Sequence, residues 1–359
     1  MRVLAALALS LLSCASLAAA EPGTPVAPVA PPAPVYRLSS TLNLPGVAPS
    51  WDYLSLDLAH GRLFLGRRAA GVSVIDLKTN RQIATIANSE KANVALIIPA
   101  LDRGYTANED GSTTEFQLST LKTLKRIQLG EAADAAFWDP ASRQVIFTFG
   151  DSKELIFFDP ATDKVTAHLA MSAEELEGVA IVGDGTLFVN ERDIGKLARV
   201  DTRNHKLLAE YDLPGCTLPT GIAYDPANHR VFVGCKGEKP VLAVVNGDSG
   251  QMVTTLEIGR GNDGVVFDPA TRRIITANGI DANMVIVQQI DADHYVFASA
   301  FTTRPIARTL AYDPATRRIY TMVAEGMVDP ARKRNLRAGS FYPNRYLDNT
   351  TTVLTYSPN

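Results

Sequence analysis

Polar residues that could bind a cation or share a proton recur about every forty residues along the sequence. Four of the seven recurring positions hold carboxylates, two hold neutral polar residues and one holds an arginine. The seven positions are Asp52, Asn93, Asp134, Glu177, Thr220, Asp263 and Arg308. Carboxylates that are brought together raise one another's pKa or recruit a cation, so a divalent cation is a possible ligand. The alternative is a hydrated polar rim whose carboxylates are held by backbone N–H groups.

Other kinds of site lack the residues they would need. The five histidines fall elsewhere in the repeat, which argues against a His-ligated copper or zinc centre and against a Ser-His-Asp triad. The glycine-rich stretch Gly259–Gly264 lies between predicted strands, with no helix to receive a phosphate. Lys and Arg number 35 against 38 Asp and Glu, which argues against a strongly basic nucleic-acid binder. We therefore predict no catalytic residues.

The elements that must position the seven polar residues are themselves repeated. Four clear copies share one pattern around a central turn, and they are Ala135–Phe149, Gly221–Cys235, Gly264–Asn278 and Thr309–Val323. Weaker copies begin at Tyr53, Val94 and Gly178, which makes seven units. In each unit an apolar strand runs into an Asp-Pro type of turn, whose Asp can accept backbone N–H groups while Pro presets φ.

Three further short strands complete each unit, and the last of them is the most polar. Seven units of four antiparallel strands predict an all-β fold, a single seven-bladed β-propeller. The seventh unit lacks its outer strand, and the segment Tyr36–Leu42 before the first unit is of the right type to supply it. We therefore expect residues 36–359 to form one ring that the N-terminal strand closes.

These repeats resemble a known family. Val72–Asn80 and Ile275–Asn278 are similar to the YVTN repeat, and the run from Tyr36 to Tyr356 resembles exported, YncE-like seven-bladed propellers. The resemblance implies a periplasmic propeller of a family without a settled enzymatic role, for which binding of ligands or nucleic acid has been proposed. The second unit departs most, with Ile98 in place of the turn Asp and Gln117 in place of the later acidic residue.

The N-terminus has the composition of an export signal. Residues 1–20 combine Arg2, an apolar stretch and a small-residue cleavage site that ends at Ala20. An alternative is a lipoprotein anchored through Cys14, which follows Leu-Leu-Ser. Residues 21–35 are rich in proline and predict an extended linker.

A long loop is expected beside the seven polar positions. Each of the seven lies just before an inner strand, so in a propeller they ring the channel mouth on one face. The loop 324–350 of the last unit returns to the same face and is far longer than its counterparts. It is either a lid, whose arginines neutralise the acidic rim or clamp an anion while its tyrosines stack, or a mobile insertion. The candidate lid residues are Arg332, Arg337, Tyr342 and Arg345, with Tyr346 as a second stacking ring.

Two of the three cysteines are expected to meet at this face. Cys216 precedes the inner strand of the fifth unit, and Cys235 ends the strand that pairs with it. In an oxidising compartment they predict a structural disulfide, and the alternative is a pair of thiols that bind a metal.

Taken together, the sequence predicts an exported, non-catalytic propeller that binds a small ligand or an envelope protein through its channel mouth. Two alternatives stay open: a lactonase-like, metal-assisted hydrolase, and a protein that binds polyanions or single-stranded nucleic acid. No cofactor is predicted apart from a possible divalent cation. A monomer is the default, and membrane contact is expected only if Cys14 carries a lipid.

Overall fold

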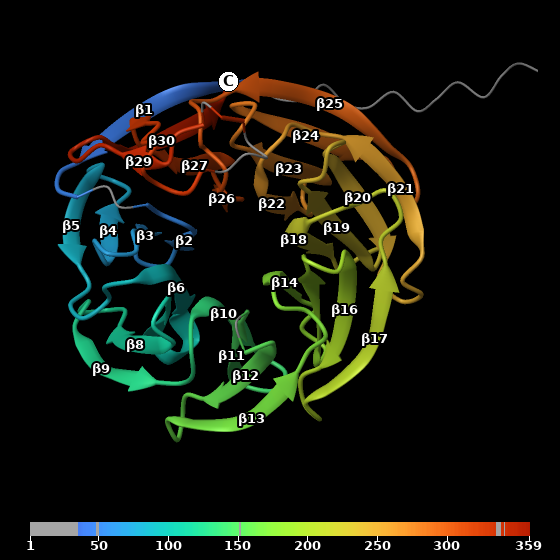
Figure 1. Ribbon diagram of the computed structural model, residues 1–359, viewed down its shortest axis with the longest axis horizontal. Helices are drawn as coiled ribbons and strands as arrows, with labels where there is room; N and C mark the ends of the chain where they lie inside the picture. Colours follow the sequence, from blue (N-terminus) through green and yellow to red (C-terminus); the bar gives the residue numbers. More distant parts are fainter. Residues whose placement is uncertain (1–34, 48–49, 151, 335–338, 341) are drawn as a thin grey trace, which may run out of the picture.

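Seven four-stranded antiparallel sheets are arranged around a central channel in the computed structural model, which confirms the predicted propeller (Figure 1). The structure describes residues 35–47, 50–150, 152–334, 339–340 and 342–359. The innermost strands line the channel, and they are β2 (Leu54–Asp57), β6 (Ala92–Ile98), β10 (Ala133–Asp139), β14 (Leu176–Ile181), β18 (Pro219–Asp225), β22 (Asn262–Asp268) and β26 (Ala311–Asp313). Blades are numbered 1 to 7 in this order.

The two middle strands of each blade form the core. The second strands are β3 (Arg62–Gly66), β7 (Arg103–Asn108), β11 (Gln144–Phe149), β15 (Thr186–Glu191), β19 (Arg230–Cys235), β23 (Arg273–Asn278) and β27 (Arg318–Val323). The third strands are β4 (Val72–Asp76), β8 (Ser112–Gln117), β12 (Glu154–Asp159), β16 (Lys196–Asp201), β20 (Val241–Asn246), β24 (Asn283–Gln289) and β30 (Thr351–Pro358). Most of their side chains are buried on both faces, because each blade is packed between two others.

Side chains on the outer strands alternate in burial, as expected for edge strands with one face in solvent. They are β5 (Arg81–Thr85), β9 (Thr123–Gln128), β13 (Lys164–Ala170), β17 (Lys206–Asp212), β21 (Met252–Glu257), β25 (Tyr295–Thr302) and β1 (Tyr36–Leu44). In β9 and β13 exposed and partly buried residues alternate strictly. Aromatic pairs join neighbouring blades, such as Phe64 with Phe116 at 5.7 Å between ring centroids.

The N-terminal strand closes the ring as predicted. β1 pairs antiparallel with β30, from Tyr36 opposite Pro358 to Leu44 opposite Thr351 (Figure 1). The Tyr36 ring also stacks on Phe301 of blade 6, with centroids 5.2 Å apart. Strands from both ends of the chain therefore share blade 7, which gains the fourth strand that the other six blades have.

The turns on the face opposite the channel mouth behave as the repeat predicts. In blade 3 the Asp139 carboxylate accepts the backbone N–H groups of Ala141 and Ser142. Blade 2 lacks this aspartate, and its turn is the short 3-10 helix η1 (Pro99–Leu101), capped by Asp102 in the left-handed conformation. The departure seen in the second repeat is thus absorbed by a different turn of similar length.

Candidate functional site: the channel mouth

A β-bulge presents most of the seven recurring polar residues at the channel mouth. The sequence predicts that they precede the inner strands, but in blades 2 to 6 they lie within the first residues of those strands. In β10, Ala133 and Ala135 pair with Phe149 and Thr148, which leaves Asp134 as the extra residue. The same register shift occurs in β6, β18 and β22, and in β14 the two residues Glu177 and Gly178 stand opposite one residue of β15. Since a bulge re-aims the extra residue, it explains how the side chains leave the plane of the blade.

One side of the mouth is a continuous network of ion pairs. Arg308 lies at its centre, with its Nε 2.7 Å from Oδ2 of Asp263 and an Nη2 3.7 Å from Oδ1 of Asp52. Arg68 donates to Asp52 at 3.0 Å, and Lys236 pairs with Asp263. We call these five residues the paired side. Burial acts to lower the pKa of Arg308, but Asp52 and Asp263 raise it above its ordinary value.

Three of the cations at the channel mouth share a position in the repeat that the sequence analysis missed. Arg68, Arg192 and Lys236 all lie just beyond the end of a second strand, in the loop that returns to the channel mouth. Glu109 holds the same place in blade 2 and pairs with Arg68 at 2.8 Å. Aligning the repeats at this second position, as well as at the first, would have found them.

The opposite side of the mouth is built differently. Glu177 accepts from Arg192 at 2.9 Å, but Asp134 has no hydrogen bond or ion pair within the described part of the chain. We call Asp134, Glu177 and Arg192 the Asp134 side. Burial, followed by the charges of Glu177 and Asp52, raises the pKa of Asp134 well above its ordinary range, against the opposing effect of the more distant Arg68. Burial also raises the pKa of Glu177, against the opposing effect of Lys236 and Arg192.

The missing partner of Asp134 has a structural cause. Its blade carries Gly150 at the position where blades 1, 4 and 5 supply Arg68, Arg192 and Lys236. A Cβ atom at residue 150 would lie 2.7 Å from the carbonyl oxygen of Glu174, closer than real Cβ contacts come. The close approach of blades 3 and 4 therefore excludes a side chain at residue 150. Blade 3 thus supplies no cation to pair with Asp134 from this position.

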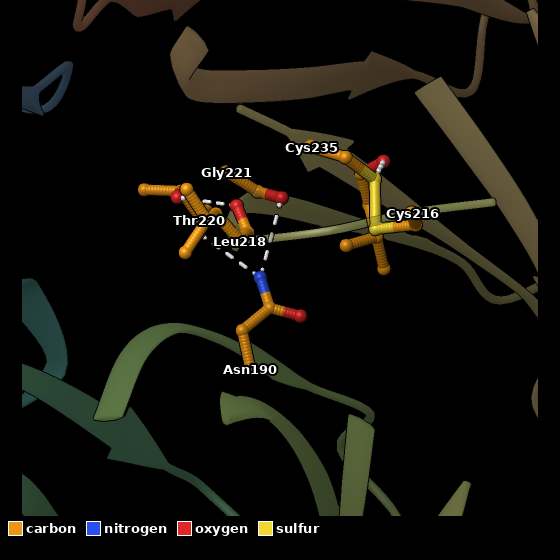
Figure 2. Close-up of a disulfide and its surroundings, with 7 residues drawn as sticks. Asn190, Cys216, Leu218, Thr220, Gly221 and Cys235 are labelled. Carbon is orange, nitrogen blue, oxygen red and sulfur yellow. Dashed lines mark hydrogen bonds between the residues drawn. A yellow bond between two sulfur atoms is a disulfide. The ribbon is translucent and has the colours of Figure 1, made fainter. Parts of the chain in front are cut away.

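The two neutral ring residues make local hydrogen bonds, Asn93 to the next blade and Thr220 within its own blade. Asn93 donates its side-chain amide to the carbonyl oxygen of Ala133 at 3.3 Å, and the Thr220 hydroxyl bonds to the Leu218 carbonyl at 3.0 Å. Figure 2 shows Asn190 of blade 4 reaching the backbone of blade 5, where its amide donates to the carbonyl oxygen of Thr220 at 3.0 Å. These bonds fix the spacing of the charged ring members.

A cavity of about 370 Å³ occupies the channel next to the mouth. Thr220 and Asp263 belong to both, and the walls of the cavity are mainly apolar side chains of the inner strands. Tyr53 also lines it, and the sequence analysis did not select this residue. Burial and then the charges of Glu177, Asp52, Asp263 and Asp134 raise the Tyr53 pKa well above its ordinary value, so the phenol keeps its proton.

The loop 324–350 contains a small hairpin, β28 (Gly326–Met327) paired with β29 (Arg345–Tyr346). Its tyrosines reach the paired side: Tyr346 packs on Trp51 with ring centroids 4.8 Å apart, and Tyr342 is close enough for its pKa to respond to Arg308. The Trp51 ring in turn lies 5.8 Å from the Arg308 guanidinium.

The arginines of that loop are placed elsewhere. Arg332 and Arg345 approach Asp329 within the loop, at 3.5 and 3.9 Å. The acidic rim is neutralised instead by Arg68, Arg192, Lys236 and Arg308. Arg337 lies outside the described residues.

Cys216 and Cys235 form a disulfide, with their Cα atoms 5.4 Å apart. Both are buried, and the bond ties the segment before β18 to the end of β19 (Figure 2). It therefore secures the top of blade 5 close to Thr220. Cys216 and Cys235 are not available as metal-binding thiols in this form.

Two further observations concern only the described part of the chain. Within it, no three His, Cys, Asp or Glu side chains are grouped closely enough to hold a metal ion. The same residues include no helix with the length and apolar character needed to span a bilayer. The expected signal at 1–20, Cys14 and nearly all of the linker 21–35 lie outside the described residues.

Comparison with known proteins supports the fold and goes no further. The chain matches no family model, and no curated sequence is significantly similar to it. Among solved structures, the WD40 repeats of RRP9 superpose with a TM-score of 0.72 at 8% identity, over 90% of this chain and 100% of that one. The structure of U3-55K gives 0.70 at 9% identity, over 88% and 98%. A chain of the mitotic checkpoint complex gives 0.68 at 14% identity, over 87% and 95%. This chain is thus a seven-bladed β-propeller with WD40-like structural neighbours.

Proposed function

We propose that this protein is an exported binding propeller of the YncE-like kind, which takes a ligand or partner at its channel mouth and performs no chemistry of its own. One observation carries the proposal: a partly buried carboxylate, Asp134, which has no hydrogen bond or ion pair among the described residues, stands beside an apolar cavity of about 370 Å³. Pockets with apolar walls and a few placed polar groups are typical of ligand sites. An uncompensated charge in such a place is costly for folding, so a binding role gives it a reason.

Export is part of this proposal. The leader composition supports it, and so does the buried disulfide, since such bonds persist in oxidising compartments. The neighbouring structures include a checkpoint complex, which is consistent with a propeller that binds a partner protein. Propeller folds serve many unrelated functions, so the site carries the argument and the fold alone does not.

Native mass spectrometry tests the proposal on the full chain, expressed with its own leader and recovered from periplasmic and membrane fractions. We expect loss of residues 1–20, or a lipid on Cys14, and a retained molecule that Asp134→Asn loses. Asp248→Asn is the matched control, because Asp248 lies at an exposed turn on the opposite face, paired with His229. An unprocessed N-terminus would overturn export. A bare mass in every preparation, or equal loss in both variants, would overturn binding at the mouth.

A further inference from the structure

The charges at the mouth discriminate between classes of ligand. On the paired side, Asp52 and Asp263 share three cations, and on the other side Glu177 has Arg192. Asp134 has no such partner among the described residues. A ligand with a positive group would supply the missing charge, whereas an anion would face Asp134 and Glu177 together.

The cavity walls define the rest of the ligand. Leu54, Val94, Leu96, Val179, Ile222 and Leu310 all line it. Apolar groups of a ligand that move from water onto such walls gain binding free energy through the hydrophobic effect. A bare metal ion or a small polar solute would leave these walls without a partner. The volume of about 370 Å³ lies in the range of small-molecule pockets.

The hydrogen-bond acceptors at the mouth indicate which kind of positive group would bind there. Carboxylates only accept, and the phenol of Tyr53 has an oxygen that can accept as well as donate. A primary ammonium group has three N–H donors and could bond to several acceptors, whereas a quaternary ammonium has none.

Resting on the proposed function, we infer that the channel mouth binds a protonated aliphatic amine, with its ammonium group on Asp134 beside Tyr53 and its apolar chain in the channel cavity. Gly150 favours this binding, because blade 3 then has no cationic side chain at that position to compete with the ligand for Asp134. The paired side forms the rigid wall against which the amine is held.

Isothermal titration with three probes of equal chain length tests this inference: hexylamine, hexanoate and hexanol. We expect hexylamine to bind at least tenfold more tightly than either other probe. Asp134→Asn should weaken hexylamine binding at least tenfold, while Asp248→Asn leaves it unchanged. Hexyltrimethylammonium should bind more weakly than hexylamine because it has no N–H donors.

Several results would overturn the inference. They are equal binding of hexanoate, unchanged hexylamine binding by Asp134→Asn, or binding of calcium ions in place of hexylamine. If hexylamine fails while Asp134→Asn still loses a co-purified molecule, the ligand class is wrong and the proposed function stands. If no molecule is retained and no probe binds, both fail. Asp134→Asn removes a poorly compensated charge, so we expect it to fold.

Discussion

The two sides of the channel mouth are made from the same repeated positions, yet they differ in how charge is balanced. On the paired side Arg308 bridges Asp52 and Asp263, and the tyrosines of the loop 324–350 pack over that region. On the Asp134 side, Gly150 occupies the position from which blades 1, 4 and 5 supply a cation, and Asp134 has no ion pair among the described residues. A blade therefore specifies where a ring residue points, while cations from the same blade or from its neighbours decide whether the charge of that residue is paired.

The difference also separates stability from function. Groups that are buried and paired contribute to the fold, and removing one partner leaves the other uncompensated. A group that is buried and unpaired lowers stability and is retained for some other reason. Mutations on the two sides should therefore change the free energy of unfolding in opposite directions, and this contrast can be tested.

The largest effect should come from Arg308→Met. This change leaves Asp52 and Asp263 without their shared cation in a largely buried setting, and we expect a loss of about 3–5 kcal/mol in the free energy of unfolding. Urea denaturation measures it. Arg345→Met is the control, because Arg345 is exposed and 3.9 Å from Asp329. A cost for Arg308→Met no larger than that of the control would show that the paired side is not a structural unit.

The disulfide lies in blade 5, directly before Lys236 of the paired side. Replacing Cys216 and Cys235 by alanine together should cost about 3 kcal/mol, because the bond closes a loop with a sequence separation of 19 residues. Reduction of the native protein with a phosphine should give a similar loss in thermal or urea unfolding. Unchanged stability in both experiments would contradict a structural role for the bond.

A smaller effect is expected for Tyr346→Leu. The ring contact between Tyr346 and Trp51 would be lost, at a cost of about 1 kcal/mol. Tyr346→Phe keeps the ring and should remain close to the native stability, as measured by urea denaturation. If both variants behave alike, the loop does not anchor through this ring.

The repeat pattern was sufficient to predict the propeller, because Asp-Pro turns and alternating strands occur in register along the chain. It also located the seven ring positions, since blade geometry determines where a residue near the start of an inner strand must lie. The bulges were not predicted, because one unpaired residue at a strand end leaves the alternation of the strand unchanged.

The charge balance of the mouth was less predictable. Arg68, Arg192 and Lys236 reach the ring from loops that look like ordinary polar turns, and pairing across blades depends on distances that a sequence does not contain. The loop 324–350 was expected to reach the rim with both arginines and tyrosines, and among the described residues it is the tyrosines that make the contacts there. Burial of their rings against Trp51 and Arg308 outweighs placement of the arginines, which remain closer to solvent.

The pH dependence of stability, compared between the native protein and Asp134→Asn, tests most directly whether the charge of Asp134 lacks a compensating cation. A carboxyl group whose pKa is raised by folding binds its proton more tightly in the folded state, so native stability falls as pH rises from the unfolded value of about 3.9 to the raised one. Glu177, Asp52, Asp263 and Arg68 face Asp134 in both proteins, so their own titrations largely cancel.

We therefore predict equal stability of the two proteins near pH 3.5 and a growing advantage for Asp134→Asn as pH rises, by roughly 1–3 °C in Tm at neutral pH. A growing disadvantage of Asp134→Asn over the same pH range would show that a cation already compensates Asp134. That result would contradict the proposed difference between the two sides of the mouth.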